Sequence, residues 1–483
     1  MEQSQLVELI RTLDADEKQI IRQFVRLPYF NQGKMRSYVP ILLDFCLEHP
    51  WDDPNIRVDK KTVFALIFPG QTFVEGKLEK VMVEVSKTIR LTLLVQNYLS
   101  DENEFSQGLD YAILVRKRGL DERFQQLISR LEKTLHEIPW KNADQIHHQY
   151  LLAYAIHDRE SLHNFKKGDL NIPNVLESLD LHGHINRLAL VNRFLQQQKI
   201  ARIEIPESQI HLLDDLPVPA PYLAYSPVLA ANYAISKLLR KERPDPADIR
   251  SLFELLQFHD LALDPESKQE FYTYLRNICI IVLSADVEKI EIEHMLHDLY
   301  RDNLQRGFLH YDGKLIPSRF WAVSSNALRV KNFSWALEFI EQYKKDLIGE
   351  NETQDIYRLN MANYLFALGR YSECLDFIPP TSPFADYMLA AKRLEIMAYY
   401  ELGSDLLHYK LEAFKVFLSR TSSKIYSEAQ KQIYLDFSNL LTQICTSPPG
   451  DIKRAERVIQ RIQAKKQAAE WRWLHEKASA LKS

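Results

Sequence analysis

The stretch NMANYLFALGRYSECLDFI, residues 360–378, decides the fold of this chain. Its apolar residues recur every three or four positions, which is the spacing of an amphipathic helix, until Gly369 interrupts them. A glycine at that place favours the left-handed conformation that ends a helix. The stretch therefore predicts two short helices joined by a tight turn, with the second helix starting near Tyr371.

The same pattern returns on both sides of this stretch. Gly403, at the end of another apolar helix, follows Gly369 by 34 residues, the period of a helix-hairpin repeat. A second correspondence, at an offset of 38 residues, relates Ala327-Leu328, Phe333, Ala336 and Ile340 to Leu365-Phe366, Tyr371, Cys374 and Ile378. We therefore expect consecutive helix hairpins, clearest over residues 318–420.

These residues resemble the tetratricopeptide-repeat superfamily. Ala362, Gly369, Tyr371 and Cys374 occupy the positions of the family's small and aromatic residues. The whole chain is also similar to an uncharacterised bacterial group of tetratricopeptide-like proteins, through PYFN near the start, FPG before a long helix and SWALEFIEQY before the clearest repeat. The resemblance implies an α-α superhelix and no particular activity.

The rest of the chain is also predicted to be all-α, in three parts. Residues 1–104 form a small helical module, whose first helix starts after Asp14, with Glu17 placed for a capping box, and ends near Arg26. Residues 105–450 form helix-hairpin repeats, interrupted by prolines at 217–227 that we interpret as a linker and by a hairpin signal at Asp312-Gly313. Residues 451–483 are expected to form one basic amphipathic helix.

Composition and charge restrict the function classes. Only 13 of the 483 residues are glycine, which disfavours the glycine-rich turns of dinucleotide-binding α/β sheets. The formal net charge of −4 creates no general attraction to nucleic acid or anionic membranes. The N-terminus lacks a secretory signal pattern, and the cysteines are interpreted as buried thiols in a reducing compartment: Cys46, Cys279, Cys374 and Cys445. A cytoplasmic location is expected.

One uncharged stretch, residues 216–236, approaches the length of a membrane span. Four prolines fall in its first half, where they would break a spanning helix, and Ser226 and Asn232 add polar groups. We therefore expect no membrane insertion.

No motif predicts catalysis, a cofactor or a metal. The glycines of Gly70-QTFVE-Gly76-Lys77 have five residues between them where a P-loop requires four, and Leu78 stands where the magnesium-binding hydroxyl should be. Histidine pairs occur without a third ligand at metal-site spacing, at 147–148, 182/184 and 294/297. The acids Asp214-Asp215 and Glu291-Ile292-Glu293 are interpreted as helix-start residues that complement the helix dipole.

Two basic segments leave functional alternatives open. Residues 58–94 contain a turn at Phe68-Pro69-Gly70 before a long helix that bears Lys77, Lys80, Lys87 and Arg90, and superficially resemble the winged-helix segment of some bacterial regulators. Residues 451–483 carry nine Lys/Arg against four acids, a local net charge of +5, with Trp471 and Trp473 among them. This last segment is expected to be a polar cap or a site for RNA, an acidic partner or a membrane surface.

The sequence therefore favours a non-catalytic scaffold or adaptor that binds a protein or peptide on the concave face of a helical array. The alternative is a nucleic-acid-associated regulator that uses residues 58–94. The identity of the partner, the residues that bind it and the oligomeric state stay open.

Overall fold

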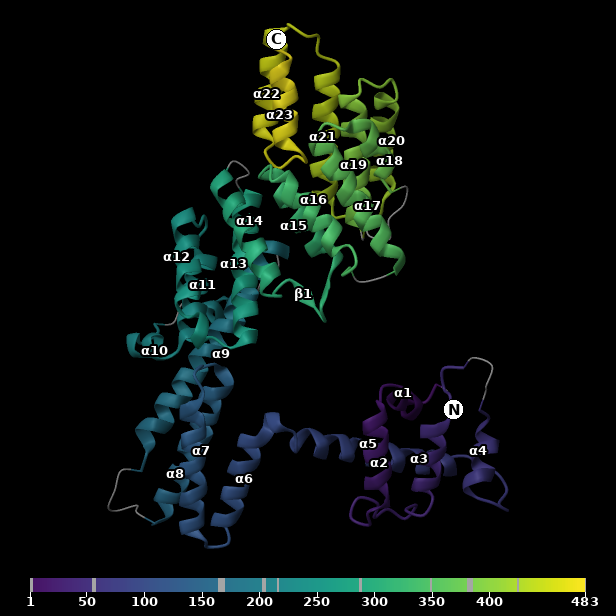
Figure 1. Cartoon of the computed structure of the whole chain (residues 1–483), viewed down its shortest axis with the longest axis vertical. Helices are drawn as coiled ribbons and strands as arrows, with labels where there is room; N and C mark the ends of the chain where they lie inside the picture. Colours follow the sequence, from purple (N-terminus) through teal and green to yellow (C-terminus); the bar gives the residue numbers. More distant parts are fainter. Residues whose placement is uncertain are drawn as a thin grey trace. The chain divides into compact units, whose positions relative to one another are not determined.

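The computed structural model describes residues 3–53, 58–163, 170–201, 206–214, 217–285, 289–347, 350–379, 385–423 and 425–482. Within these ranges the chain is all-α apart from one two-stranded hairpin and an isolated bridge between Leu315 and Leu347, which confirms the predicted all-α class (Figure 1). None of the helices described there combines the length and the apolar content that crossing a bilayer requires.

The chain forms two compact units. The first contains residues 1–138 and 147–179, and the second contains residues 139–146 and 180–483. The predicted boundary at 104/105 lies inside the first unit, and the predicted boundary at 450/451 lies inside the second. Each unit is described here by itself.

The first unit begins with a helical cluster that has its own core. It consists of α1 (Gln5–Arg11), α2 (Ala15–Arg26), α3 (Val39–Glu48), α4 (Lys60–Ile67) and α5 (Lys77–Tyr98). The predicted capping box is present, because the Asp14 carboxylate accepts from the Glu17 amide at 2.8 Å and Glu17 accepts from the Asp14 amide at 3.0 Å. Buried residues of all five helices, Ile21, Leu42 and Phe64 among them, pack together in one core.

A second core of the first unit lies among the helices that follow. These are η1 (Asp101–Asn103), α6 (Glu104–Arg116), α7 (Asp121–Glu137) and α8 (Ala143–His163), and the boundary between the two units falls within α8 and α9 (Ile172–Ala201). Phe124 and Ile128 of α7 pack between α6 and α8. An ion pair between Arg116 and Asp158 also joins α6 to α8.

The helices between α9 and the β-hairpin belong to the second unit. They are η2 (Glu207–Leu213), α10 (Ala220–Tyr225), α11 (Pro227–Arg240), α12 (Pro246–Phe258), η3 (Asp260–Ala262), α13 (Pro265–Ala285) and α14 (Ile290–Gln305). The interpretation of 217–227 as a linker is wrong for Ala220–Tyr225, which is helical. Pro221 stands in the first turn of α10, where a missing N–H costs no intrahelical hydrogen bond.

The hairpin signal at Asp312-Gly313, interpreted from the sequence only as a short interruption of the helices, corresponds to paired strands. Strand β1 (His310–Tyr311) pairs antiparallel with β2 (Lys314–Leu315). Both turn residues have positive φ, 49° at Asp312 and 71° at Gly313. A two-residue loop of that kind matches the right-handed twist of its strands, which explains why the Asp-Gly pair marked it.

The region with the clearest repeats folds into successive antiparallel neighbours. Its helices are α15 (Pro317–Arg329), α16 (Phe333–Tyr343), α17 (Glu350–Ala367), α18 (Tyr371–Phe377), α19 (Ala385–Glu401), α20 (Leu407–Arg420) and α21 (Glu428–Cys445). Each helix packs on the next, and α17 also packs on both α15 and α19. The predicted glycine caps are confirmed, since φ is 75° at Gly369 and 63° at Gly403.

The C-terminal segment differs from its prediction. It forms two helices, α22 (Ile452–Ala464) and α23 (Trp471–Ala480), which pack on each other and on α21. One continuous helix would place Lys465 or Lys466 on the stripe that Ala455, Val458 and Ile462 bury. The chain instead turns back at Glu470, where φ is 51°, so that Trp471, Leu474 and Ala478 become buried.

Candidate functional site

The glycine-rich stretch at 70–77 is structural. Gly70 and Gly76 both have positive φ and stand outside the ends of α4 and α5. The Lys77 ammonium lies 4.4 Å from the centre of the Phe68 ring, a cation–π contact within the same cluster. These residues hold the turn between two helices, and their arrangement offers no cradle of the P-loop kind.

The histidine pairs do not come together as metal ligands. His297 of α14 is buried against Trp335, with ring centres 4.9 Å apart, whereas His294 is exposed. His148 stacks on Phe105 at 4.2 Å, and His184 lies against Tyr222. Among the residues that the structure describes, no three His, Cys, Asp or Glu side chains converge in a way that could hold an ion.

The acids of the two pairs noted in the sequence differ from each other in burial or in the contacts they form. Asp214 is exposed, and Asp215 lies outside the described residues. On α14, Glu291 forms a surface ion pair with Arg250 at 2.6 Å, whereas Glu293 is buried. The sequence interpretation of Glu293 as a helix-start acid missed the partners that it has in the folded chain.

Three of the four cysteines are buried, as expected: Cys46, Cys279 and Cys374. Burial raises the pKa of each of these thiols to about 12, so they are protonated at neutral pH. The expectation is wrong for Cys445, which is exposed at the last position of α21. All four are free thiols.

The long helix of the 58–94 segment is largely a packing element. Its buried side chains meet α1, α2 and α3: Leu78, Val81, Met82, Val85, Thr88, Ile89 and Thr92. Its opposite side exposes Lys80, Lys87 and Arg90 together with two apolar side chains, Val83 and Leu94. The basic residues thus share one exposed face, but the helix around them is part of a bundle.

Side chains of the short helix α23 form ion pairs with acids on helices that are distant in sequence. The Arg472 guanidinium donates to both carboxylate oxygens of Glu293 on α14, at 2.9 and 2.8 Å. The Glu293 side chain is only 7% exposed, and Arg329 of α15 lies 3.6 Å from it. A carboxylate so far removed from water requires charged partners, and Arg472 is the nearer of the two.

A second acid, Glu401 of α19, holds the same helix further along. The Trp473 indole N–H donates to Glu401 at 2.7 Å, and the Lys477 ammonium lies 2.7 Å from the same oxygen. Burial alone would lower the pKa of Lys477, but the hydrogen bond and the negative charge of Glu401 outweigh it and raise that pKa. The cations of α23 are therefore neutralised inside the second unit.

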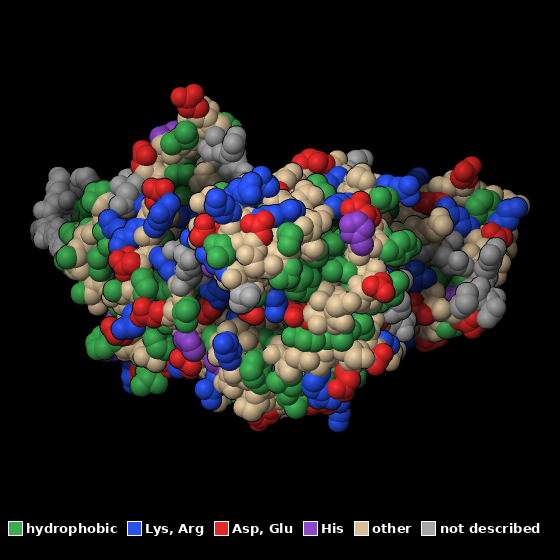
Figure 2. Space-filling view, turned by 90° about the horizontal axis from the view of Figure 1, so that it is seen from above, with side chains coloured by type: hydrophobic (Ala, Val, Ile, Leu, Met, Phe, Trp, Pro, Cys, Tyr) green, Lys and Arg blue, Asp and Glu red, His purple; other side chains and the backbone are tan. Residues whose placement is uncertain are grey.

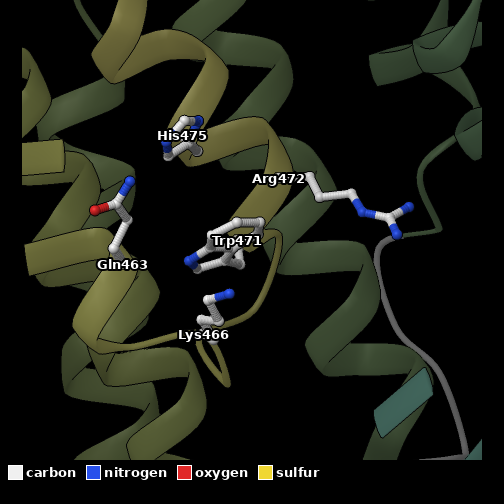
Figure 3. A pocket seen from close by; sticks show the side chains of 5 residues that line it. All are labelled: Gln463, Lys466, Trp471, Arg472 and His475. Carbon is white, nitrogen blue, oxygen red and sulfur yellow. The ribbon is translucent and has the colours of Figure 1, made fainter. Parts of the chain in front are cut away.

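A pocket of about 570 Å³ lies where α22 and α23 meet. It is lined by Gln463, Lys466, Trp471, Arg472 and His475. Figure 3 shows Lys466 and His475 on the two sides of the Trp471 ring, while Arg472 points away from them. Trp471 is 8% exposed and donates its N–H to the Ile462 carbonyl at 2.8 Å, so it is the fixed wall of the pocket.

The exposed side of α22 carries a group of cations that we call the α22 basic face: Lys453, Arg454, Arg457 and Arg461. In the part of the chain that the structure describes, none of the four pairs with a carboxylate. Arg454 donates to hydroxyls of Ser447 and Thr446, and Arg461 donates to the Gln443 amide oxygen at 2.6 Å. Figure 2 shows Lys and Arg side chains interspersed with Asp, Glu and hydrophobic side chains on the face seen from above.

Three helices of the predicted repeat region, α15, α17 and α19, expose few of their described side chains. Almost every described side chain of α15, α17 and α19 is buried or half-buried. Trp321 of α15 approaches Tyr387 of α19 with ring centres 6.1 Å apart. The α22 basic face and the pocket beside it are therefore the more accessible candidates for a site, and the sequence pointed to them only through the local charge of 451–483.

Comparison of the chain with family models, with curated proteins and with solved structures found no match.

Proposed function

We propose that this chain is a non-catalytic scaffold or adaptor that binds another protein through a helix-hairpin array of the tetratricopeptide kind. The single observation that carries the proposal is the packing order of α15 to α19, in which α17 packs on both α15 and α19 as well as on the helices next to it in sequence. Stacking of alternate helices is the arrangement by which hairpin repeats build an extended surface.

The positions of small residues support the same architecture. Ala327 of α15, Ala336 of α16 and Ala362 of α17 are all fully buried. These are places where neighbouring helices approach closely, and a larger side chain would push them apart. The four free thiols are consistent with action in the cytoplasm.

The partner surface of the proposed scaffold differs from the concave face that the sequence favoured. Because α15, α17 and α19 expose few of their described side chains, a partner has little access to them. The proposal therefore places binding on outward surfaces of the array and of its C-terminal helices. A protein partner held there would contact side chains that the array itself does not use.

A nucleic-acid-associated regulator is the second candidate, and one observation favours it. Lys80, Lys87 and Arg90 share an exposed face of α5. Against it, the same helix buries seven side chains against α1, α2 and α3, whereas a recognition helix must leave a broad face open to enter the major groove. We therefore rank it below the scaffold.

Capture of partners by the tagged full-length chain from its native host, with and without nuclease, tests the two candidates. The scaffold predicts near-stoichiometric recovery of a defined protein that nuclease does not change. A triple variant of α5, Lys80→Gln/Lys87→Gln/Arg90→Gln, should recover the same protein in equal yield. Recovery of nuclease-sensitive material that falls steeply with salt and is lost in this variant would contradict the scaffold and support the regulator.

A further inference from the structure

We propose that the α22 basic face and the adjoining pocket bind an acidic segment of a partner protein. The inference rests on the scaffold function proposed above and gives the chemistry of its partner. Residues 451–483 have a local net charge of +5, which leaves −9 for residues 1–450.

The cations of α22 form no ion pair with a described residue, whereas other cations of residues 451–483 do. Lys465 pairs with Asp436, Arg472 with Glu293 and Lys477 with Glu401. The four cations of the α22 basic face have only neutral partners in the described structure, and Asp451 beside them is engaged as the N-cap of the helix, accepting from the Arg454 amide at 3.0 Å. Glu456, the acid within α22, pairs with Lys482 at 3.7 Å, so none of the four cations is held in an ion pair by a described residue.

The spacing of these cations suits a polypeptide. Lys453, Arg457 and Arg461 follow each other at intervals of four residues, which places them about 6 Å apart along the helix. Side chains that point the same way from an extended chain repeat every two residues, at ~6.6 Å. An extended segment with acids at alternate positions can therefore meet all three in order.

A pocket lies beside the C-terminal end of α22, on a different side of the helix from Arg461. Gln463 and Lys466 line one side of it, and His475 stands on the opposite wall. The Gln463 amide supplies N–H donors, which are suited to a carboxylate. The rigid Trp471 ring, with the Lys466 ammonium 5.4 Å from its centre, limits the pocket on its apolar side (Figure 3).

An acidic peptide fits this surface better than a nucleic acid does. Proteins that hold single strands add aromatic rings on which bases stack. Here Trp471 is nearly buried, and Trp473 is hydrogen-bonded to Glu401 and packed on Tyr400. A nucleic acid that extends beyond residues 451–483 would also meet a chain whose other residues carry a net charge of −9.

Fluorescence anisotropy with the full-length chain tests the proposal at low and at physiological salt. The probes are a labelled peptide of alternating Glu and Gly and a single-stranded oligonucleotide of equal charge. The variant Lys453→Gln/Arg457→Gln/Arg461→Gln should weaken peptide binding at least tenfold. The α5 triple variant, which removes the same charge from another exposed face, should change it less than twofold.

Three results of the anisotropy experiment would overturn the proposal. The first is no peptide binding by the unaltered chain at low salt, and the second is an equal loss in both triple variants, which would indicate a general charge effect. The third is an oligonucleotide that binds tenfold more tightly than the peptide and is lost in the α22 variant. If the α22 variant still captures its protein partner in full yield, the scaffold stands and the acidic-segment site is wrong.

Discussion

The two C-terminal helices are adjacent in sequence and both basic, yet the fold uses their cations in opposite ways. The cations of α23 are used in packing, with Arg472 on Glu293 and Lys477 on Glu401. The cations of α22 form no ion pair with any described residue, and Arg454 and Arg461 donate to neutral groups. The difference comes from the turn at Glu470, which brings α23 back against α14, α19 and α21 while α22 keeps one open side.

The comparison shows that a local net charge is not yet a binding surface. A cation that meets a buried acid contributes to the stability of the fold, and only one that meets no acid can attract a partner. On this view, substitutions in α23 should change stability and substitutions in α22 should change binding. The expected outcomes below run from the largest effect on stability to the smallest.

Trp471→Ala should have the largest effect. It removes a side chain that is 8% exposed, together with its hydrogen bond to Ile462, and should lower the free energy of unfolding by about 3–5 kcal/mol. Denaturant unfolding and hydrogen exchange of residues 452–480 would measure it. Trp471→Phe is the control that keeps most of the packing and should lose clearly less. Equal stability of all three proteins would contradict the role of Trp471 as the fixed wall of the pocket.

Arg472→Ala should destabilise the second unit by about 1–3 kcal/mol, because it removes the nearer partner of a buried carboxylate. Arg457→Ala on α22 is the matched control and should change stability by less than ~0.5 kcal/mol. Thermal unfolding of both variants gives the comparison directly. In a double-mutant cycle, Arg472→Ala and Glu293→Ala together should cost less than the sum of the two. Additive costs would show that the pair is not coupled.

Acidic pH should destabilise α14, the helix that carries Glu293. Burial lowers the pKa of His297, one turn after Glu293, so the unfolded chain binds a proton at a pH where the folded chain does not. Stability should therefore be constant above about pH 6.5 and fall as the pH drops below it. The slope should flatten in His297→Gln and persist in His294→Gln, the exposed neighbour. An unchanged slope in His297→Gln would rule out this origin.

The triple variant Lys453→Gln/Arg457→Gln/Arg461→Gln should have the smallest effect on stability, less than ~0.5 kcal/mol, because these side chains are exposed on one side of a helix that keeps its packing. Circular dichroism during thermal unfolding measures it, with the α5 triple variant as control. A destabilisation as large as that of Arg472→Ala would show that α22 also depends on its cations, and the contrast between the two helices would fail.

Much of the local structure could be predicted because its causes are local. The helix that starts after Asp14, the glycine caps at Gly369 and Gly403 and the Asp312-Gly313 hairpin depend on groups within a few residues of each other. The period of apolar residues predicts a helix in the same way, since it reports which side of a single element is buried. The same local causes account for the all-α class of the chain.

The sequence by itself therefore determined the helices, their caps and the overall excess of positive charge near the C-terminus. Only the tertiary structure decided that residues 451–483 fold back on themselves, that Arg472 meets Glu293 across 179 positions of the chain, and that α15, α17 and α19 expose few of their described side chains. The physical reason is that burial and charge pairing depend on which distant elements come into contact. A periodic pattern shows that one side of a helix is buried, but not what lies against it.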